Sequence, residues 1–363
     1  MRGQPSMDLR YTRIIGTGGI GTGIFFKLDG MHTIGRNESR SGKLMPYRDY
    51  CKLHIVFHYI AAVLRAGRKG HVQLIPIGMV GDDAEGLQLI SKMREVGMEV
   101  AGIRTSKTLR TLFSVCFQYP DNTGGNITSS NGASYAVSPR DIERVVSSMD
   151  IGSGGELFLA VPEVPVASRV RLLEEGRQRK AFNAASLLPA EVNEFCRCGG
   201  FELIDYLAIN IEEARAIAGI EQEKAGSAEV AEQCITKLSA VNHDMLVSIT
   251  AGAEGSYCFK GNKMIKVPSL DVEVVSTAGA GDAYMAGVII GLCCGLPFMK
   301  ETGEPTFGAT PVASAVELGT LIASMAITAP DTINEEICSS TIKSFTEKKG
   351  IVLAENLNRI VGI

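Results

Sequence analysis

An excess of positive charge is missing from this sequence. The chain of 363 residues carries 36 Lys and Arg against 40 Asp and Glu, which gives a formal net charge of −4. Binding of nucleic acid requires a basic patch, and an anionic membrane surface attracts clusters of Lys and Arg. The sequence contains no cluster of this kind, so we expect neither nucleic acid nor a membrane among the partners.

Long hydrophobic runs and paired cysteines are also missing. The longest nearly continuous apolar run, residues 284–299, contains glycines and is too short for a membrane-spanning helix. Residues 1–6 include no apolar core typical of a secretory signal. The nine cysteines are odd in number and form no C-x-x-C pair, which indicates reduced thiols. These absences predict a cytoplasmic protein.

Short apolar runs alternate with segments of helical periodicity along most of the chain. Such alternation predicts an α/β fold, in which helices cover both faces of a mostly parallel sheet. We predict strands at 72–77, 112–118, 156–161, 181–183, 207–210, 245–249 and 267–275. We predict helices at 50–66, 87–96, 139–149, 166–180 and 313–328, with a final helix and strand within 343–363.

The most informative stretch is residues 276–287, Ser-Thr-Ala-Gly-Ala-Gly-Asp-Ala-Tyr-Met-Ala-Gly. Gly279 and Gly281 permit a tight turn that a ligand can approach closely. The turn opens a helix whose first N–H groups have no internal partner and attract an anion. Asp282 lies at this positive end, where a carboxylate stays ionised and can accept a proton. An anion site beside a base is what phosphoryl transfer to an alcohol requires; alternatively, the glycines only turn the chain and Asp282 caps the helix.

The same stretch closely resembles the signature of the PfkB (ribokinase-like) carbohydrate kinase family, D-T-[TN]-G-A-G-D-x-F-x-A-G. Tyr284 stands for the Phe, Ser276 for the leading Asp and Ala278 for Thr or Asn. The identical positions are Thr277, Gly279, Ala280, Gly281, Asp282, Ala286 and Gly287. Residues 78–86, 210–213 and 250–255 are similar to three further family motifs, G-x-V-G-x-D-x-x-G, N-x-x-E and T-x-G-x-x-G. The resemblance extends from about residue 13 to residue 328.

The resemblance implies a single ribokinase-like domain over residues 1–363, with a three-layer α/β/α architecture. Segments near 22–43 and 105–126 would form a small β lid. The implied reaction is the ATP-dependent phosphorylation of a hydroxyl group on a sugar or polyol. Asp282 would remove the hydroxyl proton, and the backbone of Gly279, Ala280 and Gly281 would stabilise the transferring phosphoryl group. We also allow for a homodimer that forms through the lid.

The resemblance also assigns the nucleotide and metal contacts. Asn210 and Glu213 would hold Mg²⁺ through water molecules. In activated relatives the leading Asp of the signature helps bind potassium; the neutral Ser276 predicts weak or absent activation by a monovalent cation. The residues expected to line ATP are Asn210, Glu213, Thr250, Gly252, Gly255, Thr277 and, where the family often has Asn, Thr320.

The sequence departs from the family on the sugar side of the site. The family's sugar-binding Asp would fall near Gly21, and Asp29 is the available substitute. His54 and His58 stand where the family has Gly and Asn; they share a helix face and either contact substrate, bind metal or pack in the core. Further candidate contacts in polar segments that could equally be solvated loops are Arg36, Asn126 and Asn131. Arg36, Arg40 and Lys43, together with the two histidines, which can gain charge near pH 6.5, suggest a substrate more anionic than ribose or fructose, or one with a different hydroxyl pattern.

Two other functions compete with the kinase interpretation. Residues 16–21, Gly-Thr-Gly-Gly-Ile-Gly, match the G-x-G-x-x-G fingerprint of nicotinamide-dependent oxidoreductases. That fingerprint requires a helix next, but residues 22–30 have the pattern of a strand ending in a turn. The second alternative is a nucleotide-binding regulator that has kept the fold and lost catalysis, although Asp282 is present.

Overall fold

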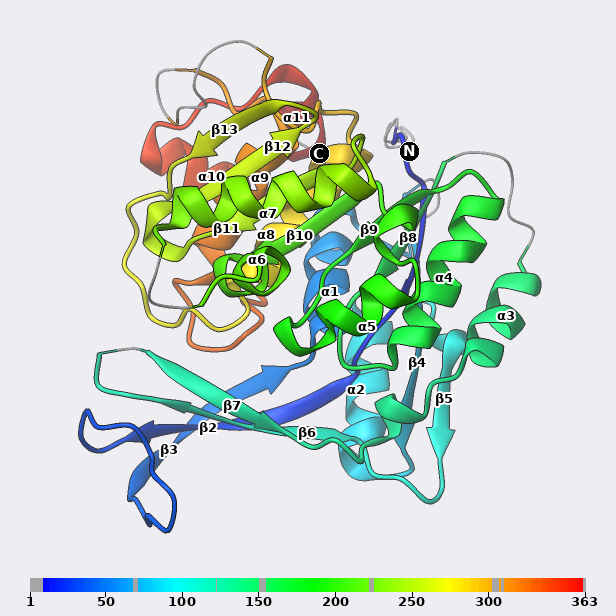
Figure 1. Ribbon diagram of the computed structural model, residues 1–363, viewed down its shortest axis with the longest axis vertical. Helices are drawn as coiled ribbons and strands as arrows, with labels where there is room; N and C mark the ends of the chain where they lie inside the picture. The colour runs from blue at the N-terminus through cyan, green and yellow to red at the C-terminus, as the bar shows by residue number, and fades with distance from the viewer. Residues whose placement is uncertain are drawn as a thin grey trace, which may run out of the picture.

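A nine-stranded sheet forms the centre of the structure, a computed structural model that describes residues 9–67, 71–121, 123–149, 155–221, 225–301, 307 and 310–361 (Figure 1). The strand order is β13-β12-β11-β10-β9-β8-β1-β4-β5, and only β12 and β13 run antiparallel to their neighbours. The strands are β1 (Arg13–Thr17), β4 (Gln73–Gly81), β5 (Ile103–Ser106), β8 (Glu156–Ala160), β9 (Phe182–Ala185), β10 (Tyr206–Asn210), β11 (Leu246–Thr250), β12 (Ser256–Lys260) and β13 (Lys263–Val267).

Helices cover both faces of this sheet, and each face has its own hydrophobic core. One core includes side chains from α1 (Lys52–Leu64), α2 (Ala84–Glu95), α8 (Ala280–Cys293), α9 (Ala315–Ala326), α10 (Ser339–Lys349) and α11 (Glu355–Val361). The other core includes side chains from α3 (Pro139–Ser147), α4 (Val166–Gln178), α5 (Val192–Arg197), α6 (Ile211–Ala218) and α7 (Ser227–Val241). The three-layer α/β/α architecture predicted from the sequence is therefore confirmed. No helix in these ranges has both the length and the apolar character needed to cross a bilayer.

A second, four-stranded sheet projects from the body below α6 and α8, and we call it the lid (Figure 1). Its order is β3-β2-β6-β7, with a parallel central pair and antiparallel outer pairs. The lid is inserted twice, between β1 and α1 and between β5 and α3. Its strands are β2 (Gly21–Leu28), β3 (Gly42–Tyr50), β6 (Leu112–Gln118) and β7 (Gly124–Thr128).

Most predicted strands and helices of the body lie within a few residues of their observed bounds, but β5, β12, β13, α5 and α7 were not predicted, and further errors lie in the lid. β3 occupies much of the segment expected to be a basic loop, and β7 forms in the Gly/Asn-rich segment expected to be irregular. Both are edge strands with largely exposed side chains, so their sequences lack an apolar pattern. Residues 268–275 form no strand, and the C-terminal region forms α10 and α11 without a final strand.

Helix α8, which begins with the signature turn, is held by close contact with α9. A Cβ atom placed on Gly287 would lie 2.8 Å from the Cα of Gly319, so the two backbones touch here. All α8 residues from Ala283 to Cys293 are buried. The packing fixes the start of α8, and with it the position of Asp282.

Candidate active site

The signature turn ends at Gly279, which has a φ of 77° and lies in the left-handed region. The Ala280 N–H donates to the Thr277 carbonyl oxygen at 3.2 Å, and α8 begins at Ala280. A Cβ atom on Gly281 would meet nothing within 4 Å, so this side of the first turn faces open space. The first N–H groups of α8 therefore have open space beside them, which leaves room for an anion.

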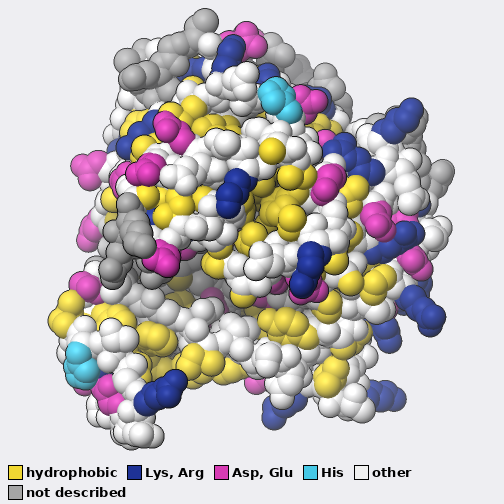
Figure 2. All heavy atoms as spheres, viewed as in Figure 1, with side chains coloured by type: hydrophobic (Ala, Val, Ile, Leu, Met, Phe, Trp, Pro, Cys, Tyr) yellow, Lys and Arg dark blue, Asp and Glu magenta, His cyan; other side chains and the backbone are white. Residues whose placement is uncertain are grey.

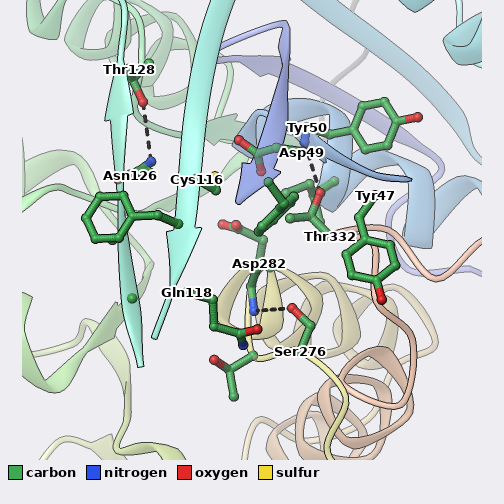
Figure 3. A pocket seen from close by; sticks show the side chains of 18 of the residues that line it. Tyr47, Asp49, Tyr50, Cys116, Gln118, Asn126, Thr128, Ser276, Asp282 and Thr332 are labelled. Atoms are coloured by element: carbon green, nitrogen blue, oxygen red, sulfur yellow. Dashed lines mark hydrogen bonds between the residues drawn. The ribbon is translucent and has the colours of Figure 1, made fainter. Parts of the chain in front are cut away.

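A cavity of about 640 Å³ separates this turn from the lid. The surface is hollowed between the lid and the body in Figure 2, and Figure 3 shows lid side chains facing Asp282. The lid contributes Phe25, Met45, Tyr47, Asp49, Gln118, Asn126 and Thr128 to the lining. The body contributes Lys52, Glu163, Asn210, Glu213, Thr277, Asp282 and Thr332.

Asp282 is paired with Lys52, the first residue of α1. The Lys52 ammonium Nζ donates to Asp282 Oδ1 at 3.4 Å. Burial raises the pKa of Asp282, and the positive charge of Lys52 acts in the opposite direction. The pKa of Lys52 is itself raised, chiefly by Asp282. Lys52 thus favours the ionised form of the carboxylate that must accept a proton.

The positive charge of Lys52 also acts on two further carboxyl groups. Burial raises the pKa of Glu163 and of Glu213 to about 7 in each case, and Lys52 opposes both shifts. The Lys52 backbone N–H donates to Glu163 Oε2 at 3.1 Å. Glu163 has a φ of 75°, unusual for a residue with a side chain and a pointer to a functional position. A Cβ atom on Gly19 would lie 2.3 Å from Glu163 Oε2, so this glycine clears space for the carboxyl group.

Of the predicted nucleotide contacts, Asn210, Glu213 and Thr277 line the cavity, and Gly252, Gly255 and Thr320 do not. Asn210 caps α6 by accepting from the N–H groups of Glu212 and Glu213, both at 2.9 Å, and Glu213 Oε2 accepts from the Asn210 N–H at 2.7 Å. Thr250 lies near Asn210, Glu213 and Asp282 around a smaller adjoining pocket. One buried carboxylate with one amide suits Mg²⁺, which prefers oxygen ligands and keeps several waters.

The remaining expected nucleotide contacts are two glycines and two threonines. Gly252 and Gly255 have φ values of 56° and 94°, and a Cβ on Gly255 would lie 2.1 Å from the Val267 carbonyl oxygen. Thr277 lines the cavity. Thr320 is buried in α9, and its hydroxyl group donates to the Val316 carbonyl oxygen at 3.1 Å. The hydroxyl hydrogen of Thr320 is therefore engaged within the helix.

Of the predicted substrate contacts in the lid and loops, only Asn126 lines the cavity. Asp29 and Arg36 are exposed beyond the end of β2, and Asn131 is exposed in the turn after β7. Arg40 is paired with Glu38 at 2.6 Å instead of facing the cavity. The lid turns its strand faces, and not its connecting loops, toward Asp282.

The two histidines of α1 are buried and do not line the cavity. His54 is 1% exposed, its ring lies 4.9 Å from the Tyr50 ring, and His58 is 6% exposed. Burial lowers the pKa of His54 to about 3 and of His58 to about 4, so the expected gain of charge near pH 6.5 is wrong. No group of three or more His, Cys, Asp or Glu side chains in the described ranges could hold a metal ion. The placement favours a packing role.

The G-x-G-x-x-G segment does not form a dinucleotide site. Strand β2 begins at Gly21, directly after the segment, where the fingerprint requires a helix. A Cβ on Gly16 would lie 2.6 Å from Phe57 Cζ, and one on Gly18 would lie 2.2 Å from Val161 Cγ2. These glycines allow close packing of α1 and β8 against β1, and the nicotinamide alternative is rejected.

Four cavity residues were missed by the sequence analysis: Asp49, Lys52, Glu163 and Thr332. Glu163 follows the predicted strand 156–161, and the carboxyl ends of parallel strands commonly carry ligand contacts. Its position after that strand could therefore have identified Glu163 as a candidate site residue. Thr332 joins distant parts of the site. Its Oγ1 accepts from the Tyr50 N–H at 2.9 Å, and its carbonyl oxygen would lie 2.5 Å from a Cβ on Gly279. The neighbouring Asp331 accepts from the Arg48 N–H at 2.7 Å.

Comparison with known proteins agrees with this geometry. The family model described as "pfkB family carbohydrate kinase" matches residues 62–338. The chain is 24% identical over 245 residues to a ribokinase of Schizosaccharomyces pombe, a match that covers 67% of this chain and 74% of the relative. It is 26% identical over 217 residues to an ATP-dependent ribose-1-phosphate kinase of Halopiger xanaduensis, covering 59% of this chain and 65% of that relative. The solved structure of ribokinase from Giardia lamblia superposes with a TM-score of 0.74 at 16% identity, over 92% of this chain and 99% of that one.

Proposed function

Because the chain belongs to the pfkB family of carbohydrate kinases, we propose that it transfers the γ-phosphoryl group of ATP to a hydroxyl group of a neutral, hydroxyl-bearing small molecule. One observation carries this proposal: Asp282, at the start of α8, lines the cavity between the lid and the body, next to the open side of the first helical turn. A base and an anion site thus face the same space, as phosphoryl transfer to an alcohol requires.

Asp282 acts as the general base for the acceptor hydroxyl. Its carboxylate removes the proton as the hydroxyl oxygen attacks the γ-phosphorus. The backbone N–H groups of Gly281 and Asp282 stabilise the negative charge on the transferring group. Lys52 keeps the pKa of the buried Asp282 from rising further, so more of the carboxylate is ready to accept a proton.

The nucleotide lies along Asn210, Glu213, Thr250 and Thr277, with the glycines 252 and 255 bringing the backbone close to the phosphates. Asn210 and Glu213 would hold Mg²⁺ through its water molecules, in keeping with their oxygen donors. When bound, the metal ion neutralises charge on the phosphate oxygens. Ordering of these two side chains by their mutual capping bonds prepares the site before the nucleotide binds.

The charges of the cavity favour a neutral acceptor. Four carboxyl groups line it, those of Asp49, Glu163, Glu213 and Asp282, against the ammonium groups of Lys52 and Lys27. An anionic acceptor would be repelled unless it brought its own cations. This replaces the anionic substrate suggested by Arg36, Arg40 and the histidines, none of which lines the cavity. The residues that line the cavity give no reason to exclude ribose or fructose, so both sugars enter the test.

The test is ADP release by the purified chain with ATP, Mg²⁺ and single acceptors. The panel contains D-ribose, D-fructose, adenosine and inosine as neutral acceptors, and ribose 1-phosphate as the anionic one. We expect turnover of at least one neutral acceptor and little with ribose 1-phosphate. Turnover of ribose 1-phosphate alone would refute the neutral acceptor, and nucleotide binding without turnover of any acceptor would favour the non-catalytic regulator.

The face of the lid that points away from the cavity supports a homodimer through the lid. Leu44, Phe113 and Ile127 are 57%, 38% and 70% exposed. The strand register places Leu44 opposite Phe26, and Ile127 opposite Val115, so apolar side chains line up across this face. Sedimentation of the wild type beside Ile127→Asp tests the proposal: we expect a dimer that the substitution dissociates, and a monomeric wild type would refute it.

All nine cysteines are free, which supports the proposed cytoplasmic location.

A further inference from the structure

Strand β3 brings a second carboxylate into the cavity, and the general-base mechanism does not use it. Asp49 is 9% exposed and lines the cavity together with Asp282. Figure 3 shows both carboxyl groups directed into the same space, Asp49 from the lid side and Asp282 from the start of α8. The proximity is also electrostatic, because the charge of Asp282 contributes to raising the pKa of Asp49.

Gly23 of β2 makes space for Asp49, and Gly21 of the same strand excludes a carboxylate from its own position. Gly23 pairs with Asp49 on one side and with Ser114 of β6 on the other. A Cβ on Gly23 would lie 2.1 Å from Ser114 Oγ and 3.0 Å from the Cβ of Asp49, so any larger residue would displace the pair. At Gly21 a Cβ would lie 2.4 Å from the Leu112 carbonyl oxygen. A carboxylate side chain has no room at that position of the strand.

The contacts of Asp49 orient its carboxylate without neutralising it. The Ser114 hydroxyl donates to Asp49 Oδ2, and the Cys116 thiol and the Tyr50 backbone N–H also lie within hydrogen-bonding reach of this carboxyl group. Within the described ranges no Lys, Arg or His side chain forms a salt bridge with Asp49. A buried carboxylate without a cation is costly unless further donors satisfy it. In a cavity built for a polyol, the available donors are substrate hydroxyl groups.

We propose that Asp49 binds one or two acceptor hydroxyls other than the hydroxyl that is phosphorylated, and so selects the substrate. This inference rests on the proposed function, since it assumes a hydroxyl-bearing acceptor in this cavity. The lid then carries the recognition group and the body carries the base. A carboxylate accepts hydrogen bonds and donates none. A substrate that lacks the recognised hydroxyl therefore leaves the Asp49 carboxylate unsatisfied.

The test compares Asp49→Asn with the wild type on the neutral acceptor that the wild type turns over best. Each of D-ribose, D-fructose, adenosine and inosine is assayed beside monodeoxy analogues that each lack one non-reacting hydroxyl. We expect the wild type to prefer the full acceptor over one such analogue by roughly 10- to 100-fold in kcat/KM. Asp49→Asn should lose most of that preference, while KM for ATP stays nearly unchanged.

Two further variants keep the test decisive. Asp121→Asn changes an exposed lid carboxylate between β6 and β7, outside the cavity, and should leave the preference intact. Ser114→Ala removes the hydroxyl that orients Asp49, and it should raise KM for the acceptor more than it lowers kcat. If the wild type turns over no neutral acceptor, the proposed function fails and this inference with it. If it does, and both Asp49→Asn and Ser114→Ala keep the full preference, only the role of Asp49 is refuted.

Discussion

The Lys52 Nζ atom lies 3.4 Å from Asp282 Oδ1, and this contact joins the first turn of α1 to the first turn of α8. The lysine side chain is 26% exposed and the aspartate side chain 13% exposed, so the pair is at the cavity wall and partly screened from solvent. The contact gives the proposed base a counter-charge before any ligand binds.

Replacement of Asp282 by Asn should abolish most of the turnover. The amide keeps the shape of the carboxyl group and cannot accept the hydroxyl proton, so kcat should fall by roughly 10²–10⁴-fold. ATP affinity, followed by titration calorimetry, should change little, because the nucleotide contacts lie at Asn210 to Thr277. Asp271→Asn, an exposed carboxylate in the segment before the turn, is the control. Full activity of the Asp282 variant would reject its role as base.

Loss of the positive charge at position 52 should move the pH dependence of the reaction. Lys52 lowers the pKa of Asp282 against the effect of burial. In Lys52→Met that pKa rises, the base is ionised only at higher pH, and the acid limb of kcat/KM moves upward in pH. On that limb the ionised fraction at a fixed pH falls about tenfold when the pKa rises by about one. Lys52→Arg should restore the limb in part, and an unmoved profile in Lys52→Met would disprove the electrostatic role.

The stability of the ligand-free protein should fall as the pH rises toward neutrality. Burial raises the pKa of Glu213 from 4.5 to about 7, so the folded chain binds a proton more tightly than the unfolded chain does. Its contribution to stability is complete below about pH 4.5 and is lost as the pH rises through about 7.

Glu213→Gln tests that stability prediction, because Gln stays neutral and can still cap α6 from the N3 position. Urea unfolding at pH 5, 6, 7 and 8 should show the wild type losing stability relative to the variant as the pH increases. Parallel stability profiles for the two proteins would contradict the raised pKa. Glu212→Gln, on the exposed side of the same helical turn, provides the control.

Potassium should activate the enzyme weakly or not at all. Ser276 is buried and its hydroxyl oxygen accepts from the Ala278 N–H at 3.3 Å, so a neutral group stands where activated relatives have a carboxylate. Initial rates in equal concentrations of sodium and potassium chloride should agree closely. A large increase in potassium would show that other oxygen atoms are sufficient to bind the cation.

Much of the body of the fold, and the turn at Gly279, could be predicted from the sequence because local rules determine them. Buried parallel strands need continuous apolar runs, and Gly279, with a φ of 77°, is required by the backbone path itself. Asn210 and Glu213 cap the helix they begin, so their spacing in the sequence is also their spacing in space.

The acceptor end could not be predicted because distant segments build it. Asp49 comes from an edge strand without an apolar pattern, and its partner Ser114 is 65 residues away. Counting along a helix predicts His54 against the substrate, but the side of α1 that faces the cavity presents Lys52 and Ile55. The direction in which a helix faces depends on tertiary packing, which spacing alone does not report.

The segment from Asp331 to Asn334 connects strand β3 to the signature turn at Gly279 and to α1. It receives hydrogen bonds from the β3 backbone at Arg48 and Tyr50, presses the Thr332 carbonyl against Gly279, and bonds to the Tyr59 hydroxyl through the Asn334 N–H. Any swing of β3 must therefore pull on the loop that shapes the phosphate turn. The position of the lid edge and the shape of the turn that begins α8 are therefore linked through one short segment of chain.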